Sequence, residues 1–94
     1  MDRWLVVYDT PDDGRRRRFA AILDNYGDRV QQSVFEVRLT AEGRERLQRR
    51  LLGVVDGKED SLRLYPLCSA CAGKVICLTE VGPEPWWEPE VVII

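Results

Sequence analysis

The sequence contains no histidine, and this absence limits the chemistry that the protein can perform. It excludes a histidine general base and any arrangement of the Ser-His-Asp kind. Among the catalytic mechanisms that remain, metal-assisted chemistry on carboxylates is therefore favoured. The sequence also offers few ligands for a structural zinc site. The Cys-x-x-Cys pair of Cys68 and Cys71 has no second such pair and no histidine to complete the coordination. We read Cys77 as an ordinary buried residue of a strand.

Long apolar runs are missing as well. No run approaches the roughly 20 residues that cross a bilayer, and the N-terminus lacks the regions that make up a signal peptide. The three cysteines are an odd number, which argues against a disulfide framework. We therefore expect a cytoplasmic protein without membrane contact. Its 94 residues, 45% hydrophobic and 32% charged, suit one globular domain that would gain from pairing with a second copy.

Charge is unevenly distributed along the chain. The formal net charge is −2, but residues 1–50 hold eleven Arg against nine acidic residues, a net of +2. Residues 51–94 hold three basic residues against seven acidic ones, a net of −4. The basic character is therefore local, and a local field decides which partners a surface attracts. Arginine also matches phosphate geometry better than lysine does.

The hydrophobic pattern predicts an α+β fold. We expect strands over residues 3–8, 29–39, 61–67 and 75–81, helices over 15–25 and 41–52, and a short helix within 68–73. Thr40 suits the cap of the second helix. The favoured order is β-α-β-α-β-α-β, with β-α-β-β-α-β as the alternative. Either order predicts a ferredoxin-like sandwich, a four-stranded antiparallel sheet with helices on one face.

The C-terminal segment is unusual. We assign residues 1–82 to the ferredoxin-like domain and 83–94 to an extended segment that three prolines keep open. Residues 91–94 are four consecutive β-formers, which should not remain as an exposed, unpaired edge. They pair with their own sheet or cross to a partner's sheet, and crossing predicts a homodimer with its sheets face to face. Trp86 and Trp87 suit interface packing better than base stacking.

Four consecutive arginines begin the first predicted helix, and we call them the arginine cluster: Arg15, Arg16, Arg17 and Arg18. They repel one another and lie at the positive pole of the helix dipole, where cations are disfavoured. One interpretation is a solvated face neutralised by Asp12, Asp13 and Asp24. The other is a grip on nucleic-acid phosphates, made by guanidinium groups and the free N–H groups of a helix start.

A helical wheel separates the four arginines. Arg16 and Arg18 flank the apolar stripe on opposite sides, Arg17 points away, and Arg15 falls within the stripe near the end of the strand. Consecutive arginines at a helix N-terminus, one of them within an apolar stripe, oppose the usual residue preferences of a helix. Such exceptions are expected at a functional site.

Asp9 is the main catalytic candidate, because it follows the first strand and lies beside the arginine cluster. One carboxylate is too few for a Mg²⁺ site, since this ion prefers several oxygens in octahedral geometry. A two-fold axis beside the strand end would bring two copies of Asp9 to one hydrated metal, which could activate a water. The alternative is that Asp9 only helps to cap the helix, and the spacing does not decide between the two.

Several segments resemble one known family. They are residues 7–10 (VYDT), the block Arg29-x-Gln31-x-Ser33-Val34-Phe35 and residues 65–68 (YPLC), which occur in order along nearly the whole chain. These segments are similar to those of the small CRISPR-associated endonucleases that partner the spacer integrase. The block from Arg29 to Phe35 is the most specific of them. Thr10-Pro11 departs from the family, many members of which carry Ile and a polar residue there.

The resemblance implies a ferredoxin-like homodimer with exchanged C-terminal strands. It also implies a Mg²⁺ ion bound by Asp9 of both chains, hydrolysis of phosphodiester bonds, and a role with the CRISPR spacer integrase in holding foreign DNA during spacer acquisition. The positions that match the family's functional residues are Tyr8, Asp9, Arg16, Arg18, Arg29, Ser33 and Phe35. Among them Tyr8, Asp9, Ser33 and Phe35 are the catalytic candidates, and the arginine cluster with Arg29 is the nucleic-acid-binding candidate.

Three hypotheses follow for the function. The first is a metal-dependent endonuclease that acts on single-stranded RNA or duplex DNA. The second is a non-catalytic dimeric scaffold that grips duplex DNA and docks the integrase. The third lies outside the family and is a small-ligand regulatory domain, since the ferredoxin-like fold hosts such modules. A sensor of small metabolites has no use for the arginine cluster, which speaks against the third.

Overall fold

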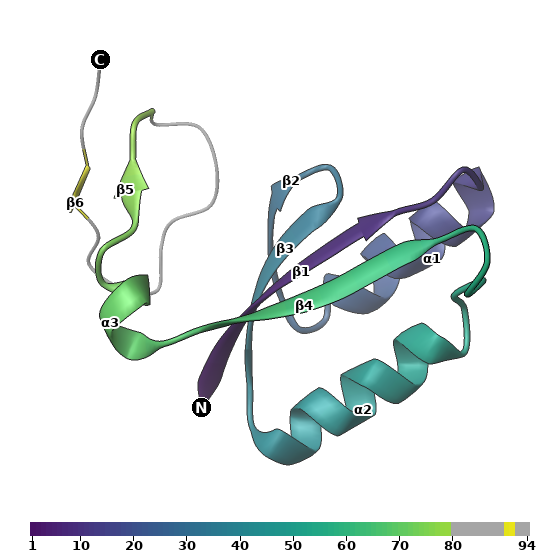
Figure 1. Cartoon of the computed structure of the whole chain (residues 1–94), viewed down its shortest axis with the longest axis horizontal. Coiled ribbons are helices and arrows are strands. Elements are labelled where there is room, and N and C mark those ends of the chain that lie inside the picture. The colour runs from purple at the N-terminus through teal and green to yellow at the C-terminus, as the bar shows by residue number, and fades with distance from the viewer. Residues whose placement is uncertain (80–89, 92–94) are drawn as a thin grey trace.

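Two helices cover one face of a four-stranded antiparallel sheet in the computed structural model, which describes residues 1–79 and 90–91 (Figure 1). The elements of this unit are β1 (Asp2–Asp9), α1 (Asp13–Leu23), β2 (Gly27–Gln31), β3 (Val34–Leu39), α2 (Ala41–Leu52) and β4 (Ser61–Leu67). The strand order is β2-β3-β1-β4. The order along the chain, β-α-β-β-α-β, is that of a ferredoxin-like sandwich. The predicted fold class is confirmed, through the alternative element order.

The predicted single strand over 29–39 is wrong, because this stretch belongs to a hairpin of β2 and β3. The turn falls at Gln32 and Ser33, and the pairing shifts between Arg29 and Gln31. Tyr8 holds this turn from β1: its hydroxyl donates to the Gln32 carbonyl at 3.1 Å, and its N–H donates to the Ser33 carbonyl at 3.1 Å. The turn contains no glycine, proline, asparagine or aspartate, so its sequence signal is limited to one serine, Ser33.

The predicted strand over 75–81 is also wrong in extent and position. It is reduced to β5 (Ile76–Cys77), which follows the short helix α3 (Ser69–Ala72) and pairs in parallel with β6 (Glu90–Val91) in a separate two-stranded sheet. The four-stranded sheet is completed by the hairpin instead. The proposed boundary between 82 and 83 and the two tryptophans lie outside the described residues. Exchange of the C-terminal strand between chains stays a prediction.

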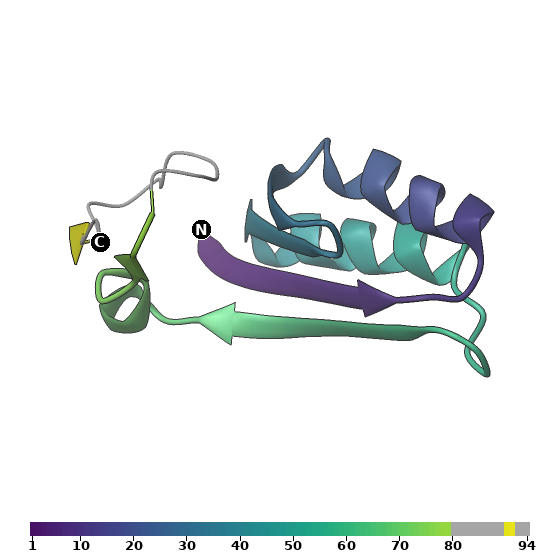
Figure 2. The same ribbon diagram turned by 90° about the horizontal axis from the view of Figure 1, so that it is seen from above.

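The core lies between the sheet and the two helices (Figure 2). Every second side chain of each strand points toward α1 and α2. The apolar stripe of each helix faces the sheet in return. The core residues with almost no exposed surface are Val6, Tyr8, Phe19, Leu23, Phe35, Val37, Leu39, Leu47 and Leu51. Asp12 and Thr40 are the N-caps of α1 and α2. The helix caps therefore fix where each helix starts relative to the sheet.

Gly27 allows the hairpin to pair closely, because it lies directly opposite Val37. A β-carbon at this position would collide with the Glu36 carbonyl oxygen and would lie 2.8 Å from the Val37 α-carbon. We predict that Gly27→Ala lowers the free energy of unfolding by roughly 2 kcal/mol or more, measured by urea denaturation. Gly57→Ala is the matched control, since nothing lies within 4 Å of its added β-carbon. An equal loss in both variants would contradict this reading of the hairpin.

In the part of the chain that the structure describes, no helix has the length and apolar character needed to cross a membrane.

Candidate functional site

Asp9 ends β1 on the face of the sheet that the helices leave uncovered. Val6 and Tyr8 point from the same strand into the core, so alternation sends Asp9 the other way, and its side chain is exposed. The Asp9 carboxylate forms no hydrogen bond or ion pair with any residue in 1–79 or 90–91. The alternative that Asp9 caps α1 is excluded, because the cap is Asp12, whose carboxylate accepts the Arg15 N–H at 2.7 Å.

Arg15 points inward to a buried carboxylate. Its Nε donates to Asp60 Oδ2 at 2.8 Å, and one terminal nitrogen donates to Asp60 Oδ1 at 3.2 Å. The Asp60 side chain has no exposed surface, and it also accepts from Thr10 Oγ1 at 2.5 Å and from the Asp56 N–H at 2.9 Å. Burial would raise the pKa of this carboxyl, but the hydrogen bonds and the Arg15 charge outweigh burial and lower it.

This ion pair changes the assignment of Arg15 as a nucleic-acid ligand. Its guanidinium is bound to Asp60, only 19% of the side chain is exposed, and the hydrogen bond to Asp60 raises its pKa. Arg15 therefore fastens the start of α1 to the loop before β4, and we leave it out of the phosphate-binding set. Asp60 is the residue that sequence reasoning missed. The wheel placed Arg15 in an apolar stripe, and a buried guanidinium requires an acidic partner somewhere in the chain.

A small cavity lies on the other side of α1. It measures about 260 Å³ and is lined by Tyr8, Arg16, Arg17, Ala20, Arg29 and Gln32. Arg16 donates to the Thr10 carbonyl at 2.7 Å and pairs with the Asp13 carboxylate, while 43% of its side chain remains exposed. Three guanidinium groups from α1 and β2 therefore border one cavity, an arrangement suited to a phosphate group. We call this cavity the arginine pocket.

Of the three remaining catalytic candidates, Tyr8 lines the arginine pocket, whereas Ser33 and Phe35 do not. Tyr8 is 2% exposed and lies 5.2 Å from the Phe19 ring, and burial raises the pKa of its hydroxyl. Phe35 is fully buried, with the Arg29 guanidinium 5.2 Å above its ring, a cation–π contact. Ser33 contributes its backbone carbonyl to the bond with the Tyr8 N–H. Phe35 has no exposed surface with which to touch a substrate, so its contribution is to support Arg29.

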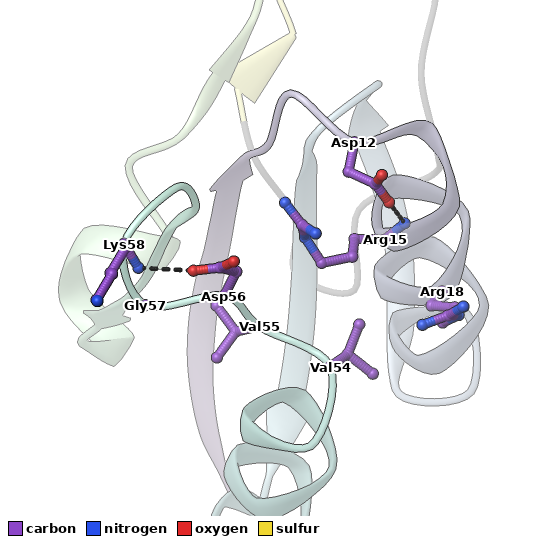
Figure 3. A pocket seen from close by; sticks show the side chains of 8 residues that line it. All are labelled: Asp12, Arg15, Arg18, Val54, Val55, Asp56, Gly57 and Lys58. Carbon is purple, nitrogen blue, oxygen red and sulfur yellow. Dashed lines mark hydrogen bonds between the residues drawn. The ribbon is translucent and has the colours of Figure 1, made fainter.

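A larger cavity opens between α1 and the loop before β4 (Figure 3). It measures about 790 Å³ and is lined by Asp12, Arg15, Arg18, Val54, Val55, Asp56, Gly57 and Lys58. Arg16 and Arg18 thus lie on opposite sides of α1, as the wheel predicts. The lining mixes acidic and basic side chains, and the Asp56 carboxylate accepts the Lys58 N–H at 2.9 Å. This mixed charge favours a polyanion less than the arginine pocket does.

Neutralisation of the arginine cluster is only partial. Asp13 pairs with Arg16, and Asp60 with Glu59 pairs with Arg15. Arg17 and Arg18 are exposed and form no ion pair with another described residue. Of the acids named in the solvated-face interpretation, Asp13 pairs with Arg16, while Arg15 pairs with Asp60 and Glu59 instead. The guanidinium groups of Arg17 and Arg18 remain available to a partner.

The described residues of one chain do not supply a complete set of metal ligands. Among residues 1–79 and 90–91 there is no group of three or more His, Cys, Asp or Glu side chains that could hold a metal ion. Asp9 alone faces solvent at the end of β1. Mg²⁺ is commonly held by one or two carboxylates together with waters and substrate phosphates. The donor set therefore fits a hydrated Mg²⁺ if a second copy of the chain contributes its own Asp9.

Comparison with known proteins identifies the family. A family model described as CRISPR associated protein Cas2 matches residues 1–75. A Rhodospirillum rubrum CRISPR-associated endoribonuclease Cas2 is 37% identical over 93 residues, covering 99% of this chain and 75% of the relative. The crystal structure of a hypothetical protein from Thermus thermophilus is 43% identical with a TM-score of 0.77, covering 89% and 96% of the two chains.

A chain from a solved partial Cas6-RT-Cas1–Cas2 complex also has this fold, with 28% identity and a TM-score of 0.65 over 77% of this chain and 84% of that one. The resemblance that began with a few short segments thus extends through the hairpin, both helices and β4. The chain belongs to the CRISPR-associated protein Cas2 family.

Proposed function

We propose that this protein is a metal-dependent endonuclease of the CRISPR system, which hydrolyses phosphodiester bonds in single-stranded RNA or duplex DNA. The observation that carries the proposal is the exposed Asp9 carboxylate, which has no partner among the described residues and lies in sequence between Tyr8 and Thr10. Tyr8 lines that pocket, and the Thr10 carbonyl holds Arg16 at 2.7 Å. The similar proteins named endoribonucleases and endonucleases support hydrolysis as the reaction.

Asp9 would hold the metal together with its copy in a second chain. When bound there, Mg²⁺ supplies electrophilic stabilisation of the phosphate and lowers the pKa of a coordinated water. The chain's own contribution is to position the substrate. Arg16, Arg17 and Arg29, which border the arginine pocket, would bind the phosphate backbone, and Arg29 is kept in place by Phe35 beneath it. Positioning of this kind accounts for much of the catalysis in phosphate chemistry.

The uncovered face of the sheet supports a homodimer as the functional unit. Neither α1 nor α2 lies on it (Figure 2), yet it carries apolar side chains. Leu5 is paired with Tyr65 across β1 and β4, and Val7 is paired with Val34 across β1 and β3. Tyr65 is 44% exposed. Apolar surface of this kind marks an interface, and a second copy packed face to face would bring two Asp9 side chains together.

The experiment that tests the proposed function is a cleavage assay with purified protein. Labelled single-stranded RNA and duplex DNA are each incubated with Mg²⁺, and parallel samples contain EDTA. We expect products that require Mg²⁺ from at least one substrate. Binding of both nucleic acids without cleavage of either would contradict the enzymatic proposal.

We predict that phosphate binding by the arginine pocket produces a steep salt dependence. Each phosphate contact contributes about 0.9 to the slope of log affinity against log salt for duplex DNA. Replacing Arg16 and Arg29 together by alanine should therefore reduce the slope by about 2, measured by fluorescence anisotropy. Replacing Arg46 and Arg49 of α2, which border neither cavity, removes the same charge and is the control. Equal slopes in the two double variants would contradict specific binding at the pocket.

The structural likeness to a chain from a Cas1–Cas2 assembly favours a second function beside the first. In this reading the homodimer holds duplex DNA through the same arginines and docks the Cas1 integrase during spacer acquisition, without any need for a metal at Asp9. The two functions share one surface and are compatible. The third hypothesis, a small-ligand regulatory domain from outside the family, falls away with the family assignment.

A further inference from the structure

Two cysteines lie close together where the chain leaves the main sheet. Cys68 follows directly after β4 and is the N-cap of α3, and the Cys71 N–H donates to the Cys68 Sγ at 3.3 Å. Both cysteines are free and exposed. None of the roles proposed above for Asp9 or the arginines uses them. Among residues 1–79 and 90–91 they have no third ligand with which to form a metal site.

We propose that Cys68 and Cys71 form a thiol–disulfide exchange site, which takes low-molecular-weight disulfides as substrates and closes into an internal disulfide. Residues three apart on one helical turn have α-carbons on the order of 5 Å from each other. This separation lies within the range that a disulfide requires. Ring closure therefore needs rotation of two side chains and no movement of β4, which ends at Leu67.

The surroundings assign different roles to the two sulfurs. The hydrogen bond from the Cys71 thiol and the backbone N–H groups of Cys71 and Ala70 lower the pKa of Cys68, with Lys74 adding positive charge. The same thiol pair raises the pKa of Cys71. Since the thiolate is the nucleophile, Cys68 is the attacking residue and Cys71 is the resolving residue.

The reaction balances in two steps. The Cys68 thiolate attacks one sulfur of a disulfide such as oxidised glutathione, forms a mixed disulfide and releases one glutathione thiolate. Cys71 then loses its proton to solvent, and its sulfur attacks the Cys68 sulfur and releases the second glutathione. The two protein thiols are oxidised by two electrons, and the external disulfide is reduced to two thiols.

Peptide mapping tests the site on the whole protein. Oxidised glutathione is added near pH 7, the free thiols are blocked, and trypsin is applied. Cleavage after Arg63 and Lys74 places Cys68 and Cys71 in one peptide, residues 64–74, and Cys77 in another, residues 75–94. We expect peptide 64–74 to lose two hydrogen atoms in mass and to retain no glutathione. A disulfide that links the two peptides, or two chains, would overturn the proposal.

Single variants separate the two roles. Cys71→Ser should accumulate a stable mixed disulfide of Cys68 with glutathione, because the resolving thiol is absent. Cys68→Ser should form the corresponding adduct at Cys71 about tenfold more slowly. In 8 M urea, where α3 is unfolded, the two variants should react at equal rates. Equal rates in the folded proteins, or protection of wild-type thiols by a stoichiometric zinc ion, would overturn the assignment.

Discussion

Asp9→Asn is expected to reduce Mg²⁺-dependent cleavage by more than about 100-fold while the affinity for nucleic acid remains unchanged. The substitution keeps the shape of the side chain and removes its charge, which is the property that a hard cation requires. Because the carboxylate is exposed and contacts no other described side chain, the fold should not depend on it. The free energy of unfolding should change by less than about 0.5 kcal/mol.

Asp2→Asn is the matched control for this experiment. Asp2 is exposed at the opposite end of β1, so its replacement removes the same charge from the same strand. Cleavage should survive in this variant at the level of the wild type. Persistence of cleavage in Asp9→Asn would show that the activity resides elsewhere or in a contaminant. Loss of cleavage in both variants would show that the effect is not specific to Asp9.

Asp60→Asn is expected to have the largest effect on stability. The amide cannot match the charge of Arg15, and the Thr10 hydroxyl and the Asp56 N–H lose a carboxylate acceptor in a site without exposed surface. Removing one partner of a buried pair leaves the other charge uncompensated. We expect the melting temperature to fall by roughly 10 °C in thermal denaturation followed by circular dichroism.

Glu59→Gln is the control, because Glu59 contacts the same arginine at 3.4 Å but is 58% exposed. An exposed ion pair contributes little, so the melting temperature should hardly change. Replacing Arg15 and Asp60 together by leucine should destabilise less than Asp60→Asn alone. Equal effects of Asp60→Asn and Glu59→Gln would contradict the buried ion pair.

The same carboxylate predicts how stability depends on pH. The pKa of Asp60 in the folded chain lies below its ordinary value of 3.8. Its contribution is therefore present above that ordinary value and is lost as the pH falls through the lower, folded-state pKa. Wild-type protein should lose this stabilisation in acid, and Asp60→Asn should lack that part of the pH dependence in urea denaturation.

The fold class was within reach of sequence reasoning, because alternation and helical spacing in residues 1–67 are strong local signals. Thr40 was correctly placed as a helix cap for the same reason. The hairpin was missed because the turn at Gln32 and Ser33 contains only a single serine as a turn signal and no glycine, proline, asparagine or aspartate. Its position depends instead on Tyr8, which bonds both carbonyls from a distant strand. A contact across 24 residues leaves no trace in a local pattern.

In the candidate site, too, some features follow from the local sequence and others depend on contacts between distant residues. The position of Asp9 at a strand end followed from its place in the sequence, and the wheel correctly separated Arg16 from Arg18. The partner of Arg15 could not be identified, because Asp60 lies 45 residues away and only the packing of β4 beside β1 brings it close. The convergence of Arg16 and Arg29 likewise needed the hairpin, which places β2 against the flank of α1.

The most direct test of the central claim is the stoichiometry of Mn²⁺ binding, with Mn²⁺ as a spectroscopic substitute for Mg²⁺. Electron paramagnetic resonance counts free against bound ion while the oligomeric state is measured by light scattering. Two chains that share one metal through their Asp9 carboxylates should bind one Mn²⁺ per dimer, and Asp9→Asn should abolish this binding. One ion per chain, or binding that survives Asp9→Asn, would contradict the account.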